Sequence, residues 1–268
     1  MEENEGRQAK KSKVIRYKIL KYTGISGLYR FFTRKHEASG YKLAIEEKSG
    51  FLVAHRSGTT DLQVIEHSFE NDIFFSGVPE YTPSENDIMI DVGAHIGTFS
   101  MLASRKVPKG KVFAIEACRE SYNYCLVNKK LNDLNNVETC NYALHDKEGT
   151  IKLNYDTEGW GHSITSVLTG EGEEVQAISM ESFMSKYKID QCNFIKFNCE
   201  GAEFPIILGT PISILAKFKF MLVLYHLDLA PESSLVQLEN HFTNAGFKLR
   251  FSNVHPNGKR GWLIATKS

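Results

Sequence analysis

The stretch MIDVGAHIGTF, residues 89–99, joins an apolar run to a segment with helical spacing through a turn that holds two glycines. The run ends in Asp91, after which Gly93 permits a tight turn and Gly97 permits close packing of the following helix on the strand. Histidine at position 95 tolerates a positive φ better than most residues. The pattern predicts a strand–turn–helix unit whose loop N–H groups and helix N-terminus bind an anion.

Strand-like and helix-like patterns alternate from about residue 87 onward. We expect strands at 88–92, 111–116, 137–141, 194–198 and 219–225, helices at 98–106, 119–132 and 180–188, a further helix that ends at Gly246, and a last strand in GWLIATK. Such alternation is typical of an α/β protein with a mostly parallel sheet and helices on both faces. Ligands of such sheets bind beyond the carboxyl ends of the strands.

Glu116 ends the expected strand KVFAIE, next in the chain after the strand that carries Asp91. A carboxylate there can accept hydrogen bonds from both ribose hydroxyls of a nucleoside cofactor. Dinucleotide-binding loops usually read G-x-G-x-x-G, and this loop lacks the second glycine. S-adenosylmethionine (SAM) has no phosphate: the loop N–H groups suit its carboxylate, and Asp91 can accept from its ammonium group. The alternative is a βαβ unit without a ligand.

Several stretches together carry a resemblance to the FkbM family of SAM-dependent methyltransferases. They are DIMIDVGAHIGTFSMLASR, KVFAIEA, LVNKKLNDLNNV and IDQCNFIKFNCEGAEFPIILG, and the upstream HRSGTTDLQVIEHSFEND resembles the segment that precedes this domain. The likeness runs from about residue 51 to 264. It implies a Rossmann-like class I methyltransferase fold with a seven-stranded sheet, SAM as the cofactor, and methyl transfer, usually to oxygen.

The resemblance also implies which residues contact the cofactor. The family usually has Asn at the place of His95 and commonly Asp at the place of Asn198, so a mechanism that needs a carboxylate at 198 is in doubt. Tyr142 and Ala143, just after the third strand, are expected to flank the adenine. The expected cofactor-binding residues are Asp91, Gly93, His95, Gly97, Glu116, Tyr142, Ala143 and Asn198.

Methylation of a hydroxyl requires removal of its proton, and three side chains are candidates for this role. Glu200 follows the fourth strand and His226 the fifth, and His162 lies in the loop EGWGHSIT. Each has a structural alternative: Glu200 as a helix cap or a partner of Lys196, His226 as a hydrogen-bonded core histidine, and His162 as a surface residue. Lys196, in an apolar strand, is expected to pair with a carboxylate, because an unpaired buried ammonium group is costly.

A divalent metal site is an alternative interpretation of the polar residues around the fourth and fifth strands. Oxygen and nitrogen ligands could come from Asn198, Glu200, Glu203 and His226. The spacing does not require a metal, and an amide at 198 binds a cation less firmly than a carboxylate. No metal site is expected.

The first 36 residues differ in charge from the rest. Between Arg7 and Lys35 every charged residue is Lys or Arg, whereas residues 37–268 carry more acidic than basic residues. Apolar residues recur there at near-helical spacing, so we expect a basic amphipathic helix that packs on the main domain or lies on an anionic membrane surface. A nucleic-acid partner is not expected, because the rest of the chain is net acidic.

The start MEENEGRQAKKSK lacks the apolar core of a secretory signal, and no apolar run reaches the roughly 18 residues that span a bilayer. The five cysteines are odd in number and form no CxxC pair. They are expected to be reduced thiols in a cytoplasmic protein, with residues 7–35 as a candidate contact to the inner membrane surface. The oligomeric state does not follow from these residues.

The resulting interpretation has three parts. Residues 1–36 form the basic extension, residues 37–80 a β-hairpin and connector (YKLAIEE, FLVAHR and LQVIEHSF), and residues 81–268 the methyltransferase domain. We expect O-methylation of a sugar, a glycan precursor or another small-molecule hydroxyl. The alternatives are a nucleoside-cofactor-binding module without catalysis and an NAD-dependent oxidoreductase.

Overall fold

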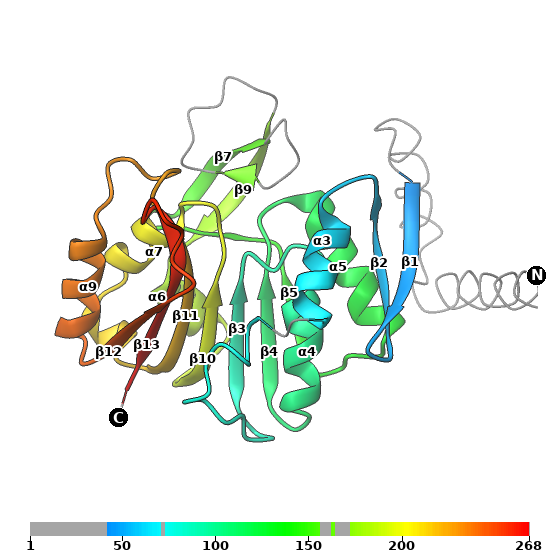
Figure 1. Cartoon of the computed structure of the whole chain (residues 1–268), viewed down its shortest axis with the longest axis horizontal. Helices are drawn as coiled ribbons and strands as arrows, with labels where there is room; N and C mark the ends of the chain where they lie inside the picture. The colour runs from blue at the N-terminus through cyan, green and yellow to red at the C-terminus, as the bar shows by residue number, and fades with distance from the viewer. Residues whose placement is uncertain (1–41, 71–72, 156–161, 164–171, 268) are drawn as a thin grey trace, which may run out of the picture.

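The protein is built around one seven-stranded sheet in a computed structural model that describes residues 42–70, 73–155, 162–163 and 172–267 (Figure 1). Across the sheet the strands run in the order β12 (Lys248–Ser252), β13 (Arg260–Thr266), β11 (Phe218–His226), β10 (Cys192–Phe197), β3 (Ile88–Val92), β4 (Lys111–Ile115) and β5 (Val137–Cys140). Neighbouring strands are parallel from β11 to β5, and β13 is antiparallel to both β11 and β12. This is the seven-stranded class I methyltransferase order, so the predicted fold class is confirmed.

Helices cover both faces of this sheet and divide the core in two. One group is α3 (Asp61–Phe69), α4 (Thr98–Lys106) and α5 (Arg119–Leu131), and the other is α6 (Met180–Lys186), α7 (Glu203–Gly209), α8 (Ile212–Leu215) and α9 (Leu235–Asn244). Successive residues of β3 alternate between the two cores: Met89 packs with the first group and Ile90 with the second. A strand that is covered on both faces is apolar throughout, which explains the run that first indicated it.

The order β10–β3 at the centre of the sheet fixes where a ligand can bind. β3 connects to β4 on one side, whereas β10 and β11 continue on the other. The connections therefore diverge beyond the carboxyl ends of β3 and β10, and such a switch point leaves a crevice.

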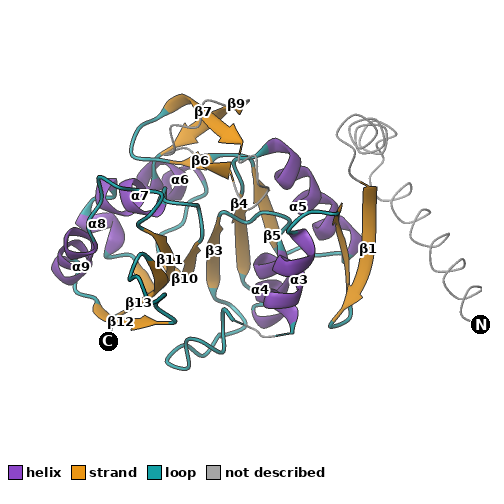
Figure 2. Ribbon diagram, turned by 45° about the horizontal axis from the view of Figure 1, so that its top comes forward, coloured by secondary structure: helices purple, strands orange, loops and turns teal. Residues whose placement is uncertain are grey.

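The predicted β-hairpin is present as β1 (Lys42–Lys48) and β2 (Phe51–Ser57), and it lies beside α5 (Figure 2). Two asparagines, Asn128 in α5 and Asn132 at its C-cap, form hydrogen bonds with the outer edge of β2. Asn128 accepts from the N–H of Ala54 at 2.7 Å and donates to its carbonyl at 3.0 Å, and Asn132 does the same for Leu52 at 2.8 Å in both directions. Residues four apart lie on one face of a helix, so the two amides act as a substitute strand.

The connector after the hairpin differs from the expectation in one respect. LQVIEHSF forms most of helix α3, and Ile65 is fully buried in the same core as α4 and α5. The run of β-branched and aromatic residues was misleading, because Val64, Ile65 and Phe69 also fit a helical face.

A second sheet of four short strands was not predicted. It has the order β6 (Ala143–Leu144), β9 (Gly172–Ile178), β7 (Gly149–Tyr155) and β8 (His162–Ser163). In Figure 1 the arrows of β3 and β4 point toward the end of the molecule that carries β7 and β9. The four-stranded sheet has a small apolar cluster of its own, which includes Leu153 of β7 and Val175 of β9. The sheet therefore lies on the ligand-binding side.

Two earlier expectations concern segments outside the described residues: the basic segment 7–35, and the loop EGWGHSIT apart from the backbone of residues 162–163. Within the part of the chain that the structure describes, no helix is both long enough and apolar enough to cross a membrane.

Candidate functional site

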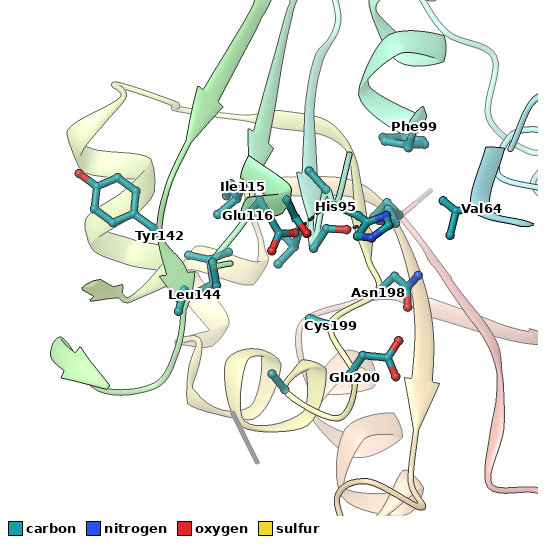
Figure 3. Close-up of a pocket in the computed structure, with 18 of the residues that line it drawn as sticks. Val64, His95, Phe99, Ile115, Glu116, Tyr142, Leu144, Asn198, Cys199 and Glu200 are labelled. Atoms are coloured by element: carbon teal, nitrogen blue, oxygen red, sulfur yellow. Dashed lines mark hydrogen bonds between the residues drawn. The ribbon is translucent and has the colours of Figure 1, made fainter. Parts of the chain in front are cut away.

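A cavity of about 230 Å³ opens beyond the carboxyl ends of β3, β4 and β10 (Figure 3). It gathers residues from distant parts of the sequence, and many of the predicted site residues line it. They are Gly93, His95, Glu116, Tyr142, Ala143, Asn198 and Glu200. Among the described residues, the predicted Asp91, Gly97 and His226 lie outside this lining.

The turn after β3 is pressed against the end of β10. Gly93 has a φ of 72°, and a Cβ added there would lie 1.9 Å from the carbonyl oxygen of Asn198. No side chain fits in that space, so glycine is needed for both its conformation and its lack of a side chain. His95 also has a positive φ, 54°, which histidine tolerates better than most residues.

Glu116 closes the turn from the neighbouring strand. Its carboxylate accepts from the backbone N–H of His95 at 2.7 Å and from that of Cys118 at 2.9 Å. Burial raises the pKa of Glu116 above its usual range, against the opposing effect of these donors. These two hydrogen bonds hold the side chain at the cavity wall, next to the turn.

The loop N–H groups are used differently from the expectation. Those of Gly93 and Ala94 both donate to the carbonyl of Ile115 at 3.0 Å, and that of His95 donates to Glu116. The predicted anion site is thus not available from these three groups, because they hold the turn to β4.

Asp91 supports the turn from beneath and does not face the cavity. It is fully buried, and its carboxylate accepts from Lys196 Nζ at 2.9 Å and from Ser100 Oγ at 2.7 Å. Lys196 also donates to the carbonyl of Gly93 at 2.9 Å. The predicted pairing of Lys196 with a carboxylate is confirmed, but the partner is Asp91, whose oxygens are consequently not placed to meet a ligand.

Gly97 also has a role other than the predicted one. It adopts a φ of 88°, and a Cβ there would lie 2.8 Å from Sγ of Cys125 on α5. The glycine lets the start of α4 approach α5, not the strand, and it does not border the cavity.

The two ends of the cavity differ in character (Figure 3). Tyr142 and Leu144 lie on one side of Glu116, and His95 and Asn198 on the other. The first end is apolar and also includes Ala143 and Leu153. The hydroxyl of Tyr142 accepts a hydrogen bond from Lys186 Nζ at 2.9 Å. At the second end the Oδ1 atom of Asn198 is buried without a hydrogen-bond partner among the described residues.

Glu200 enters the second end of the cavity from the turn after β10 (Figure 3). Behind it, His226 is buried between two carboxylates: its Nδ1 lies 3.0 Å from Glu203 Oε1, and its Nε2 lies 3.7 Å from Glu200 Oε2. Of these two predicted proton acceptors, Glu200 lines the cavity, whereas His226 lies behind Glu200 and does not line it.

The remaining candidates at this end are His162 and a metal site. His162 belongs to β8, and its side chain is outside what the structure describes. Nowhere in the described ranges do three His, Cys, Asp or Glu side chains gather as metal ligands.

One cluster at the cavity was missed by sequence reasoning. Arg56, at the end of the hairpin, lines the cavity and donates to Asp61 through Nε at 2.9 Å and Nη2 at 2.8 Å. Nε2 of His95 lies 2.9 Å from Arg56 Nη2 and 3.2 Å from Asp61 Oδ1. The only signal was the Arg and Asp of HRSGTTD, a spacing that surface loops also show.

The pKa of Asp61 follows from this cluster. Burial would raise it, but the hydrogen bonds from His95 and Arg56 outweigh burial and hold the pKa of Asp61 well below its usual range. A depressed folded-state pKa contributes stability above the unfolded-state value near 4, and that stability is lost as the pH falls.

We therefore expect Asp61→Asn to destabilise the protein at pH 7 and less so in acid. Below about pH 4 the difference in unfolding free energy between wild type and variant should shrink by up to about 1.4 kcal/mol per pH unit. Urea unfolding at pH 7, 4 and 3 measures it. A difference that stays constant over this range would mean that Asp61 is not ionised in the folded protein.

Comparison with known proteins gives a consistent picture. The family model described as "Methyltransferase FkbM domain" matches residues 91–249, more than half of the chain. The chain is 37% identical over 71 residues to "Methyltransferase sdnD" of Sordaria araneosa, covering 26% of this chain and 27% of that protein. It is 34% identical over 70 residues to the uncharacterized protein MJ1452 of Methanocaldococcus jannaschii, covering 26% of each. The match thus spans about a quarter of each curated relative.

Among solved structures, the chain is similar to methyltransferase FkbM from Methylobacillus flagellatus, at 16% identity and a TM-score of 0.49, covering 72% of this chain and 46% of that one. It is also similar to M. jannaschii TYW2 in complex with AdoMet, at 14% identity and a TM-score of 0.45, covering 84% of both chains.

Proposed function

Because the chain belongs to the FkbM methyltransferase family, we propose that it transfers a methyl group from SAM to a hydroxyl oxygen of a sugar, a glycan precursor or another small molecule. The observation that carries the proposal is the facing pair at the cavity: the Gly93 turn at the end of β3 and the Glu116 carboxylate at the end of β4. A nucleoside whose ribose meets Glu116 has its base at the apolar end and its other substituent at the polar end.

The charges around the cavity suit a positively charged ligand. The arginine and the lysine of its lining are each neutralised by a buried aspartate, Arg56 by Asp61 and Lys196 by Asp91, and His95 also lies 3.2 Å from Asp61. The acidic lining residues are Glu116, Glu120 and Glu200. The excess of negative charge favours a cation such as a sulfonium over the pyrophosphate of a dinucleotide.

The residues at the polar end fit the amino-acid part of SAM. The Oδ1 atom of Asn198, which has no hydrogen-bond partner within the described ranges, is an acceptor for the ammonium group, the role first expected of Asp91. When bound, SAM supplies a methyl group on a positively charged sulfur: the oxygen–carbon bond forms as the sulfur–carbon bond breaks, and sulfur keeps the electron pair. Glu200, the carboxylate at this end, is the candidate acceptor of the hydroxyl proton.

Calorimetry with SAM and with NAD tests the cofactor. Wild-type protein should bind SAM and not NAD. Glu116→Gln should lower SAM affinity by about tenfold or more, since a hydrogen bond to a charged group contributes about 1.5–3 kcal/mol. Glu138→Gln, an exposed change on the neighbouring strand β5, is the matched control and should bind as wild type.

Mass spectrometry of hydroxyl-bearing sugars and small molecules incubated with enzyme and SAM then tests the transfer. A gain of one methyl group identifies the acceptor. Binding of NAD in preference to SAM, or SAM affinity that is unchanged in Glu116→Gln, would contradict the proposal. SAM binding with no methylated product from any acceptor would favour a cofactor-binding module without catalysis.

A further inference from the structure

Behind the cavity wall, three ionisable side chains form a row from the protein interior to Glu200. Glu203, the first residue of α7, is fully buried. Its Oε1 accepts from the backbone N–H of His226 at 2.7 Å and lies 3.0 Å from His226 Nδ1, and its Oε2 accepts from the N–H of Gly201 at 3.1 Å. The same carboxylate oxygen already accepts from the His226 backbone N–H, and this arrangement assigns the donor at 3.0 Å to Nδ1 of His226.

This arrangement determines what the other imidazole nitrogen faces. With Nδ1 held by Glu203, Nε2 is directed at Glu200, at 3.7 Å from Oε2. Glu200 itself is in a fixed turn, with a φ of 51°, followed by Gly201 with a φ of 93°. The side chain of His226 is only 4% exposed, whereas that of Glu200 is 24% exposed and borders the cavity.

Such a row is not required for packing. Replacing buried charged groups by apolar side chains of similar volume is often neutral or stabilising, so a buried carboxylate–imidazole pair indicates a role other than stability. The neighbouring residues of β11, such as Val223 and Tyr225, already supply the apolar packing of this face.

We propose that Glu203 and His226 are positioning residues that make Glu200 the proton acceptor for methyl transfer. This inference rests on the proposed function. As the methyl group bonds to the acceptor oxygen, the hydroxyl proton moves to the carboxylate of Glu200 and from there to Nε2 of His226. Glu203 keeps Nδ1 protonated throughout, so the proton ends on an imidazolium between two carboxylates and later leaves to solvent.

The charges around His226 support its ability to hold that proton. Burial lowers its pKa, but the hydrogen bond and charge of Glu203 and the charge of Glu200 outweigh burial, and the pKa of His226 is raised above its usual range. Arg260 of β13 opposes this, although it is itself paired with Asp228 at 2.8 Å. Since the relay starts from neutral His226, kcat should rise with pH through the pKa of this residue.

The first test is an NMR titration of the His226 ring in protein without ligand, which does not depend on SAM or on any acceptor. Glu203→Gln removes a negative charge at 3.0 Å and should lower the pKa of His226 by about one unit or more. Glu232→Gln, an exposed change before α9, should leave it unchanged. An unaltered His226 titration in Glu203→Gln would overturn the proposal.

The second test is kinetic, with the acceptor found by mass spectrometry. Glu203→Gln and His226→Gln should each lower kcat about tenfold, with little change in the KM for SAM. In the pH profile of kcat, the acid limb should shift to lower pH in Glu203→Gln. It should disappear in His226→Gln. The Glu203→Gln variant can place an amide NH₂ group opposite the backbone N–H of Gly201, which can impair folding. His226→Gln is a second variant that avoids this problem. If His226→Gln keeps the wild-type kcat and acid limb, the relay is wrong even where calorimetry supports SAM binding.

Discussion

Gly93→Ala is expected to destabilise the protein by roughly 3 kcal/mol or more and to abolish measurable SAM binding. The added methyl group would lie 1.9 Å from the carbonyl oxygen of Asn198, and the residue would also have to keep a φ of 72°. Both the turn and the end of β10 must move, and these two segments form the floor of the cavity. Urea unfolding and SAM calorimetry measure the two effects.

Gly246→Ala is the matched control for this change. Gly246 has a φ of 84°, and no heavy atom lies within 4 Å of an added Cβ. This variant carries the cost of the left-handed backbone alone, about 1–2 kcal/mol. It is at the end of α9, so its SAM affinity should stay at the wild-type value. Equal destabilisation by the two substitutions would show that the close approach to Asn198 is not a real constraint.

Lys196→Met is expected to cost about 3–5 kcal/mol of unfolding free energy, because it leaves the buried carboxylate of Asp91 without its cation. The same change removes the donor to the carbonyl of Gly93, so SAM affinity should fall as well. Chemical unfolding gives the first quantity and calorimetry the second.

Two companion variants separate the ion pair from side-chain size. Asp91→Asn combined with Lys196→Met removes both charges and keeps an acceptor for Ser100, so it should be more stable than Lys196→Met alone. Lys109→Met breaks an exposed pair with Glu85, whose side chains are 64% and 51% exposed, and should cost at most about 1 kcal/mol. A double variant that is no more stable than Lys196→Met would count against a paired, charged Asp91.

The sequence was most informative where periodicity and turn chemistry agree. The strand at 88–92 was predicted to the residue, because an apolar run followed by glycines leaves few alternatives. The last helix and last strand were also found, but β12 was not: KLRFS is a short edge strand whose residues are half-exposed or exposed. The small sheet of β6 to β9 escaped for the same reason, since polar residues dominate it.

At the site, the sequence identified the right residues more often than their roles. Asp91 and Gly97 belong to the motif, but the position of the Asp91 carboxylate depends on Lys196 and the close packing at Gly97 involves Cys125, both distant in sequence. Arg56 lies at the cavity through contacts between distant segments: Asn128 and Asn132 bond the hairpin, and Asp61 and His95 bond Arg56 itself. Long-range contacts of this kind leave no local pattern, and they decide which groups face a ligand.

The amide pair on α5 has a further consequence for association between chains. A strand at the edge of a sheet offers unpaired N–H and C=O groups that can template a foreign strand. β2 pairs with β1 along one edge, and on the other edge the groups of Leu52 and Ala54 are already bonded to Asn132 and Asn128. At these residues the outer edge of β2 is thereby closed to strand addition, by side-chain amides of a neighbouring helix and not by charged side chains or proline.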